Sequence, residues 1–192
     1  MTKGKKLFLL GLILVVIDQV TKILVKTNMS LGEAIPVIGD FFRICFVENE
    51  GMAFGWKWGG VFGKVLLSSF RLVLFVFLWY WICKLMKRET KVPTGVLVGL
   101  TLIAAGALGN IIDCWFYGLL FSESTPWTVA SFGQGGYAPF MLGKVVDMFS
   151  FSIFPPVFNV ADSCVSVGAV YLALFHWRFF ADEDKDQKTS NK

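Results

Sequence analysis

The chain has 192 residues, of which 55% are hydrophobic and 17% are charged. A soluble domain carries about 25% charged residues, and this chain has more apolar surface than one water-soluble core could bury. The composition therefore excludes an ordinary soluble protein and predicts an integral membrane protein with a single domain. The net charge of +4 does not indicate a nucleic-acid partner, because the basic residues follow a pattern typical of membrane topology.

Four apolar stretches approach the roughly 20 residues that a helix needs to cross a bilayer. They cover residues 7–25, 65–85, 94–118 and 157–177. Lysines precede the first stretch, as in a signal peptide, but the stretch is too long and no small-x-small cleavage site follows it. We interpret it as a retained helix, so the predicted fold class is an all-α integral membrane protein with four transmembrane helices.

The chain divides into one membrane-embedded domain, residues 1–180, and a polar tail from residue 181 to 192 that is predicted to be disordered. Lysine and arginine gather in the N-terminal tail, in the link between the second and third helices and in the C-terminal tail. The two much longer links, 26–64 and 119–156, hold few of them. The positive-inside rule therefore predicts that both termini are cytoplasmic and that the two long links are external.

The external links carry their own patterns. Residues 42–47 alternate in polarity, which predicts a short strand in a small extracytoplasmic β-cradle. The glycines and tryptophans between 51 and 60 predict an amphipathic segment lying on the membrane surface. The 119–156 link is rich in Ser, Gly, Pro and aromatic residues, and loops beyond about 15 residues without regular structure are commonly functional. We therefore expect the function on the outer face.

Four polar residues inside the apolar stretches are expected at a similar depth. With a rise of about 1.5 Å per residue, Asp18 lies about 10 Å below the outer end of the first helix, and Asn110 and Asp113 lie about 12 Å and 7 Å below that of the third. The fourth helix descends and places Asp162 about 7 Å inside. Such groups are costly in hydrocarbon, so their convergence from three helices predicts a site near the outer surface.

A purely structural interpretation of single polar residues stays open. Asp18 and Lys22 are spaced i,i+4 and can neutralise each other, and Asn110 can form an interhelical hydrogen bond. Arg71 is interpreted as snorkelling or as pairing with an acid. A zinc site is not expected, because the only histidine, His176, has no ligand-spaced cysteine near it. The cysteines are interpreted as small buried fillers: Cys45, Cys83, Cys114 and Cys164.

Five polar motifs follow one another along the chain. They are D-Q-V-T-K at 18–22, N-E-G-M-A-F at 49–54, G-A-L-G-N-I-I-D at 106–113, V-V-D-M-F at 145–149 and F-N-V-A-D-S at 158–163. In this order, and on these helices and loops, they resemble the motifs of the lipoprotein signal peptidase (signal peptidase II) family. The resemblance spans nearly the whole chain and implies a bacterial membrane aspartic endopeptidase.

The resemblance implies that Asp147 and Asp162 are the catalytic pair. Two close carboxylates in a low-dielectric site share one proton, so one can activate water while the other polarises the scissile carbonyl. A rigid break at Pro155 and Pro156 is expected to fold the chain back and bring the two acids together. Substrate-binding or supporting roles are implied for Asp18, Lys22, Asn49, Gly51, Asn110, Asp113, Asn159 and Ala161.

The implied substrate is a diacylglyceryl-modified prolipoprotein, cut immediately before its lipidated cysteine in the bacterial cytoplasmic (inner) membrane. The active site would then lie near the outer leaflet. No metal ion or other cofactor is implied. Membrane lipids and globomycin-type inhibitors are expected partners, nucleic acid is not, and the protein is expected to act as a monomer.

Two features depart from the family pattern. Cys114 stands where the family usually has an arginine directly after the motif aspartate, and Arg71 is one candidate to replace that arginine. The 119–143 stretch is also much longer than the family's usual link into its V-V-D motif. We interpret it as an extra surface element, for example a lid.

Two other classes of function stay open. A small proton-coupled carrier would also place acids inside the membrane, although these acids crowd one leaflet and no internal repeat is visible. A structural or assembly factor would use the polar groups only to hold helices together. Neutralising the acids would then abolish folding and not an activity.

Overall fold

The structure is a computed structural model that describes residues 1–50, 60–88 and 92–181. The predicted amphipathic surface segment lies almost wholly outside the described residues, and so does Gly51. The same is true of the predicted disordered tail beyond Ala181.

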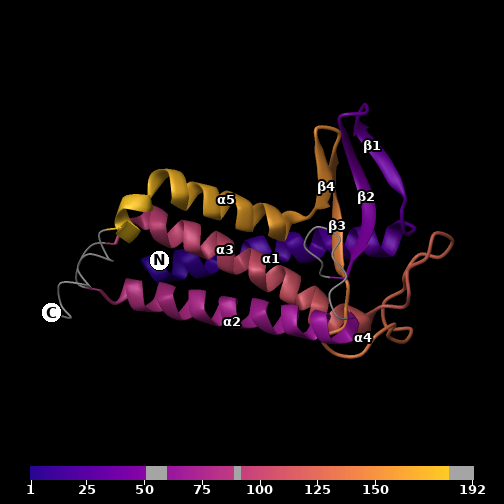
Figure 1. The fold of residues 1–192 in the computed structure, drawn as a ribbon, viewed down its shortest axis with the longest axis horizontal. Coiled ribbons are helices and arrows are strands. Elements are labelled where there is room, and N and C mark those ends of the chain that lie inside the picture. The colour runs from indigo at the N-terminus through magenta and orange to yellow at the C-terminus, as the bar shows by residue number, and fades with distance from the viewer. Residues whose placement is uncertain (51–59, 89–91, 182–192) are drawn as a thin grey trace.

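Long helices form the body of the molecule (Figure 1). They are α1 (Lys3–Asn28), α2 (Gly60–Met86), α3 (Thr94–Ile112) and α5 (Val160–Phe175), and α3 continues through a π-helical turn (Asp113–Tyr117) into the short α4 (Gly118–Leu120). Three of the continuous helical segments, Lys3–Asn28, Gly60–Met86 and Thr94–Leu120, are long and apolar enough to cross a membrane. Large apolar side chains such as Phe8 and Phe77 are exposed on α1 and α2, as expected of helices that face lipid.

The fourth predicted transmembrane helix is shorter than expected. The stretch 157–177 was predicted to be helical throughout, but residues 157 and 158 belong to a strand and α5 begins at Val160. Its 16 residues span about 24 Å, less than the roughly 30 Å of a hydrocarbon core. The described residues therefore contain three apolar helices of membrane-spanning length and one shorter apolar helix, instead of four equal spans.

A four-stranded antiparallel sheet stands at one end of the helices, so the fold is mostly helical, as predicted, but not purely α-helical (Figure 1). Its order is β1 (Ala34–Ile38), β2 (Phe42–Asn49), β3 (Val145–Phe151) and β4 (Phe154–Phe158). The strand predicted at 42–47 is confirmed as part of β2. The sheet is larger than the predicted β-cradle because β2 pairs with a strand of the other external link, with Val47 opposite Asp147.

The chain reverses between Asp147 and Asp162 at the β3–β4 turn, residues 152–153. The predicted break at Pro155 and Pro156 is wrong, because both prolines lie within β4. β4 is an edge strand of the sheet, where the missing N–H groups of proline are tolerated. A hairpin therefore brings the chain back to the start of α5.

The central helix is α3, against which α1, α2 and α5 all pack. A Cβ atom added at Gly106 would overlap the backbone oxygen of Ala161, and one added at Gly109 would lie 2.5 Å from Asp18 Oδ2. Glycine at these two positions lets α5 and α1 approach α3 closely, as small residues do in membrane helix packing. Polar groups on three helices can therefore meet.

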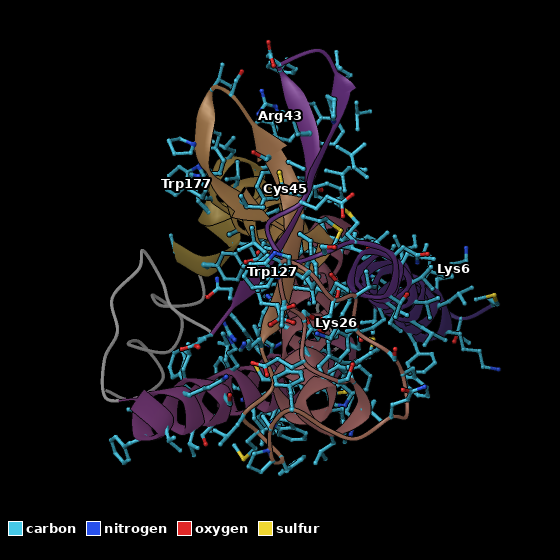
Figure 2. The ribbon with its side chains drawn as sticks, turned by 90° about the vertical axis from the view of Figure 1, so that its right-hand side faces the viewer. Lys6, Lys26, Arg43, Cys45, Trp127 and Trp177 are labelled. Atoms are coloured by element: carbon cyan, nitrogen blue, oxygen red, sulfur yellow. The ribbon has the colours of Figure 1, made fainter. Side chains whose placement is uncertain are left out.

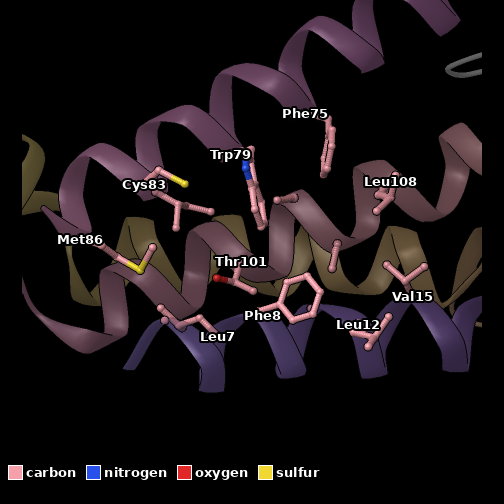
Figure 3. Close-up of a pocket in the computed structure, with 15 residues that line it drawn as sticks. Leu7, Phe8, Leu12, Val15, Phe75, Trp79, Cys83, Met86, Thr101 and Leu108 are labelled. Atoms are coloured by element: carbon pink, nitrogen blue, oxygen red, sulfur yellow. The ribbon is translucent and has the colours of Figure 1, made fainter. Parts of the chain in front are cut away.

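An apolar cavity of about 150 Å³ lies between α1, α2 and α3 (Figure 3). Phe8 and Leu12 line it from α1, Phe75 and Trp79 from α2, and Thr101 from α3. Its walls are almost entirely hydrocarbon, and none of the predicted site residues lines it. The polar site is therefore separate from this cavity.

The 119–143 segment folds back onto the end of α3. Phe121 is buried in one cluster with Val146 and Met148 of β3. At the other end of the segment, the Gly143 N–H donates a hydrogen bond of 2.8 Å to the Cys114 carbonyl oxygen. Both ends of the segment are thus attached to the elements that carry the predicted site.

Candidate active site

Asn159 connects the two acids that were predicted to be catalytic. Asp147 lies in β3, and Asp162 lies in the first turn of α5. The Asn159 Nδ2 donates to Asp147 Oδ1 at 2.7 Å, and its backbone N–H donates to Asp162 Oδ2 at 3.4 Å. One residue therefore contacts both carboxyl groups.

The position of Asn159 follows from its role as the N-cap of α5. Its Oδ1 accepts a 2.8 Å hydrogen bond from the Asp162 N–H, while the Asp162 carboxyl group accepts from the Asn159 N–H. This reciprocal arrangement is a capping box, in which the side chain of the third helical residue accepts a hydrogen bond from the backbone N–H of the N-cap residue. The start of α5 thereby fixes the orientation of both side chains.

Two further amide side chains each hold one acid. From β2, Asn49 donates through Nδ2 to Asp147 Oδ2 at 3.1 Å. From α3, Asn110 donates through Nδ2 to Asp162 Oδ1 at 2.8 Å. Each carboxyl group is therefore oriented from two sides.

A buried ion cluster lies next to Asn110. Lys22 Nζ lies 2.9 Å from Asp18 Oδ2 and 2.8 Å from Asp113 Oδ2. It also donates a 2.8 Å hydrogen bond to Asn110 Oδ1. The i,i+4 pair and the interhelical hydrogen bond allowed by the sequence are both present, and together they turn the Asn110 amide nitrogen toward Asp162.

The two acids of this cluster also anchor the elements that carry the catalytic candidates. Asp18 Oδ1 accepts a 2.8 Å hydrogen bond from the Ala161 N–H, at the start of α5. Asp113 Oδ2 accepts one of 3.2 Å from the N–H of Val146, the residue before Asp147. The cluster is thus continuous with the site, and its groups do more than neutralise one another.

Gln19, for which no role was predicted, belongs to the same cluster. Its Nε2 donates to Asp18 Oδ2 at 3.1 Å and to Asp113 Oδ1 at 3.0 Å. Its Oε1 accepts a 3.1 Å hydrogen bond from the Tyr117 hydroxyl. The available signal was an amide side chain directly after Asp18 in an apolar helix, which needs a buried partner as much as the acid does.

Asp147 is almost fully buried, with 3% of its surface exposed. Burial, and then the charge of Asp162, raise the pKa of Asp147 above the ordinary value of an aspartic acid. Hydrogen bonds from Asn49 and Asn159 favour the carboxylate and offset part of this effect. The carboxyl group of Asp147 therefore keeps a proton at higher pH than an exposed aspartic acid does.

Cys114 contacts an arginine from another helix. Arg71 of α2 donates through Nη1 to Cys114 Sγ at 3.3 Å, so its guanidinium reaches the position in the π-helical turn after α3 where the resemblance had predicted an arginine. All four cysteines of the chain are free thiols, and Cys114 and Cys164 are buried while Cys45 and Cys83 are partly exposed.

Known proteins share this combination of fold and motifs. The family model for signal peptidase (SPase) II matches residues 10–178. The lipoprotein signal peptidase of Porphyromonas gingivalis is 41% identical, over 92% of this chain and 84% of its own. That of Halothermothrix orenii is 31% identical, over 89% of this chain and 94% of its own. A bacterial membrane enzyme solved by the in meso method at 2.3 Å superimposes with a TM-score of 0.63 and 26% identity, covering 98% of this chain and 92% of its own.

The family match extends from α1 to the end of α5, so it covers every element that carries a site residue. It favours a peptidase over the carrier and the assembly factor that the sequence had left open. The chain belongs to the signal peptidase II family of aspartic peptidases.

Proposed function

We propose that Asp147 and Asp162 are the catalytic dyad with which this multi-pass membrane protein, a lipoprotein signal peptidase, removes signal peptides from prolipoproteins. The observation that carries the assignment is the contact of Asn159 with both carboxyl groups. A residue that caps α5 and also donates to β3 holds the two acids in one hydrogen-bonded unit.

The chemistry follows from a single proton shared by the pair. Asp147 is the better holder of that proton, because burial and the neighbouring charge raise its pKa. The ionised Asp162 removes a proton from water as the water oxygen attacks the scissile carbonyl carbon, and Asp147 donates its proton to the carbonyl oxygen. When the resulting gem-diol collapses, the C–N bond breaks, the leaving nitrogen takes a proton from Asp162, and one gem-diol hydroxyl returns its proton to Asp147 as the carbonyl re-forms.

The location of the acids suits a substrate anchored in lipid. Asp147 lies in β3 and Asp162 in the first turn of α5, and both elements meet at the end of the helices that carries the sheet (Figure 1). With both termini cytoplasmic, this end is external, and a scissile bond just beneath the outer surface would reach the dyad. The proposed substrate is a diacylglyceryl-modified prolipoprotein cut before its lipidated cysteine, in the bacterial cytoplasmic membrane, by a protein that acts as a monomer.

Supporting roles follow from the contacts. Asn49, Asn110 and Asn159 orient the two carboxyl groups. Asp18, Lys22 and Asp113 hold the three helices and β3 together around them, with the Ala161 N–H as the anchor point on α5. Gly51, outside the described residues, is assigned to substrate binding by its motif alone.

The test is to replace each acid by its neutral isostere. Asp147→Asn and Asp162→Asn should each yield folded protein that cleaves a lipidated prolipoprotein peptide at least about 1,000-fold more slowly than the parent in detergent, since the residues of a catalytic unit act together. The control is Asp40→Asn, because Asp40 is exposed and pairs only locally with Arg43.

The control variant should keep the parent rate. If both dyad variants also kept it, the assignment of the two acids would be wrong. The parent enzyme should remain active in the presence of a metal chelator, because no step uses a metal, and a globomycin-type cyclic peptide should inhibit it.

A further inference from the structure

A second buried charge cluster lies beside the dyad network and is not explained by the reaction. Lys26, at the end of α1, pairs with Glu48 of β2. Its ammonium group also donates a 2.9 Å hydrogen bond to Ser124 Oγ, and the Ser124 hydroxyl donates one of 2.9 Å to Glu48 Oε1. Lys144, just before β3, lies with Nζ 3.1 Å from Glu48 Oε2. Four separate parts of the chain therefore meet at one carboxylate.

The Lys26–Glu48 pair at the centre of the cluster is enclosed, unlike the basic residues at the surface. Lys26 is 0% exposed, and in Figure 2 it lies within the molecule while Lys6 projects from α1. Its ammonium group lies 5.0 Å from the centre of the Tyr137 ring and 5.5 Å from that of Phe121, within the range of cation–π attraction. Although burial alone would raise the pKa of Glu48, the ammonium group of Lys26 holds it below the ordinary value. Glu48 is therefore ionised.

Such a cluster is a poor source of stability. Burying paired charges costs about as much desolvation energy as their attraction returns, and removing one partner leaves an unpaired buried charge. A better-attested use of a buried polar group is to fix one arrangement among several. The arrangement fixed here is that of β2, β3 and the 119–143 segment.

The strands that the cluster joins are those that present the dyad. Glu48 directly precedes Asn49, which donates to Asp147. In the β2–β3 register, Glu48 lies opposite Val146 and Asn49 lies opposite Val145. A displacement of Glu48 would therefore move the Asn49 amide and the backbone next to Asp147 together.

The 119–143 segment enters this arrangement through two contacts. Ser124 supplies the hydroxyl group between Lys26 and Glu48. The Tyr137 hydroxyl accepts a 2.7 Å hydrogen bond from the Lys144 N–H, at the beginning of the run that leads to Asp147. Lifting the segment away as a lid would break both contacts and remove the Ser124 hydroxyl that bridges Lys26 and Glu48.

We propose that Lys26, Glu48, Ser124 and Lys144 are positioning residues for the dyad, and that the 119–143 segment is a fixed support for Asp147 and not a lid. This inference rests on the proposed catalytic role of Asp147. The 119–143 segment then has a function in the reaction. It acts through Asn49 and β3 and does not contact the substrate.

The test compares two serines of the same segment. Ser124→Ala removes the hydroxyl group from the cluster. Ser122→Ala removes a hydroxyl group outside the cluster, which accepts a hydrogen bond from the Ser131 N–H. We expect Ser124→Ala to lower kcat about tenfold, since small misplacements of catalytic groups are costly, while KM changes less than about twofold. Ser122→Ala should resemble the parent.

The pH profile separates positioning from mere stability. The charged groups that face Asp147 are Asp162 and Lys22, and its hydrogen-bond donors are Asn49 and Asn159. If Ser124→Ala releases Asn49, the Asp147 carboxylate loses a donor, its proton is held more tightly, and the alkaline limb of kcat moves to higher pH. Glu48→Gln and Lys144→Met should shift the limb in the same direction.

Two outcomes would overturn the inference or its basis, and they are distinguishable. Folded Ser124→Ala and Lys144→Met variants with parental kcat and pH profile, but a lower melting temperature, would show that the cluster only stabilises the fold. Activity that survives Asp147→Asn would instead contradict the proposed dyad. If Glu48→Gln does not fold, the two other variants decide.

Discussion

The pKa of Asp147 depends on its two amide neighbours as well as on its burial. Asn49 and Asn159 each donate to one of its carboxyl oxygens, at 3.1 Å and 2.7 Å. Both hydrogen bonds favour the charged form, whereas burial and Asp162 favour the neutral form. If the two acids share a proton as proposed, this balance sets the pH at which they lose it.

Removing Asn49 should move that pH upward. In Asn49→Ala the Asp147 carboxylate loses one hydrogen-bond donor, so the pKa of Asp147 rises further. Activity is lost as the pH rises through this pKa, so the variant should stay active to a higher pH than the parent. The alkaline limb of a kcat–pH profile measures this shift. Asn28→Ala is the matched control, since the exposed Asn28 amide donates within its own helix, and an unmoved limb in Asn49→Ala would contradict the role of Asn49.

At the scale of elements, the junction of β4 and α5 combines a helix cap with an active-site contact. The β4 strand ends at Phe158, Asn159 caps the helix, and Asp162 completes the capping box. Serine and asparagine both cap helices well, but a serine side chain is too short to donate to Asp147 as well. The two roles of Asn159 can therefore be separated by mutation.

Asn159→Ser should keep the stability of the parent and lose its activity. Asn159→Ala should lose both, with a destabilisation of about 1 kcal/mol from the missing cap. Thermal melting in detergent and peptide cleavage measure the two effects. Near-parental cleavage by Asn159→Ser would mean that the contact with Asp147 is dispensable.

At the scale of the whole molecule, the sheet and the helix ends define two different poles. In Figure 1, α1 and α3 begin and α2 and α5 end at the pole opposite the sheet. Lys3, Lys5 and Lys6 lie at the start of α1, and Lys84 lies in the last turn of α2, at this same pole. By the positive-inside rule we expect this pole to be cytoplasmic.

Reporter fusions should therefore give opposite results at the two poles. Green fluorescent protein joined after Lys192 should fluoresce, because it stays in the cytoplasm. Alkaline phosphatase inserted near Gln134, in the exposed turn of the 119–143 segment, should be active, because it is exported. If alkaline phosphatase were active after Lys192 and green fluorescent protein fluoresced near Gln134, the orientation would be the reverse of the one proposed.

Much of the site could be predicted because its signals are local. An acid or amide in an apolar helix is conspicuous by its desolvation cost, and a constant helical rise converts its position into depth. This reasoning placed Asp18, Asn110, Asp113 and Asp162 in one layer, and the structure joins all four through Lys22 and the two asparagine amides.

The missed features depend on contacts between distant parts of the chain. Apolar length alone predicted a full helix at 157–177, but pairing of β4 with β3 takes its first residues. Lys26 and Glu48 looked like ordinary loop charges, because nothing near them in the chain indicates that Ser124 and Lys144 will enclose them.

The sequence by itself determined that this is a membrane protein, where its helices lie and which polar residues lie at one depth, since hydrophobicity and helical rise act residue by residue. Its five motifs also indicated the peptidase family. Only the tertiary structure decided that β2 pairs with β3, that Asn159 contacts both acids and that Lys26 pairs with Glu48 in a buried cluster. Those features arise from packing, which brings together groups that no local pattern relates.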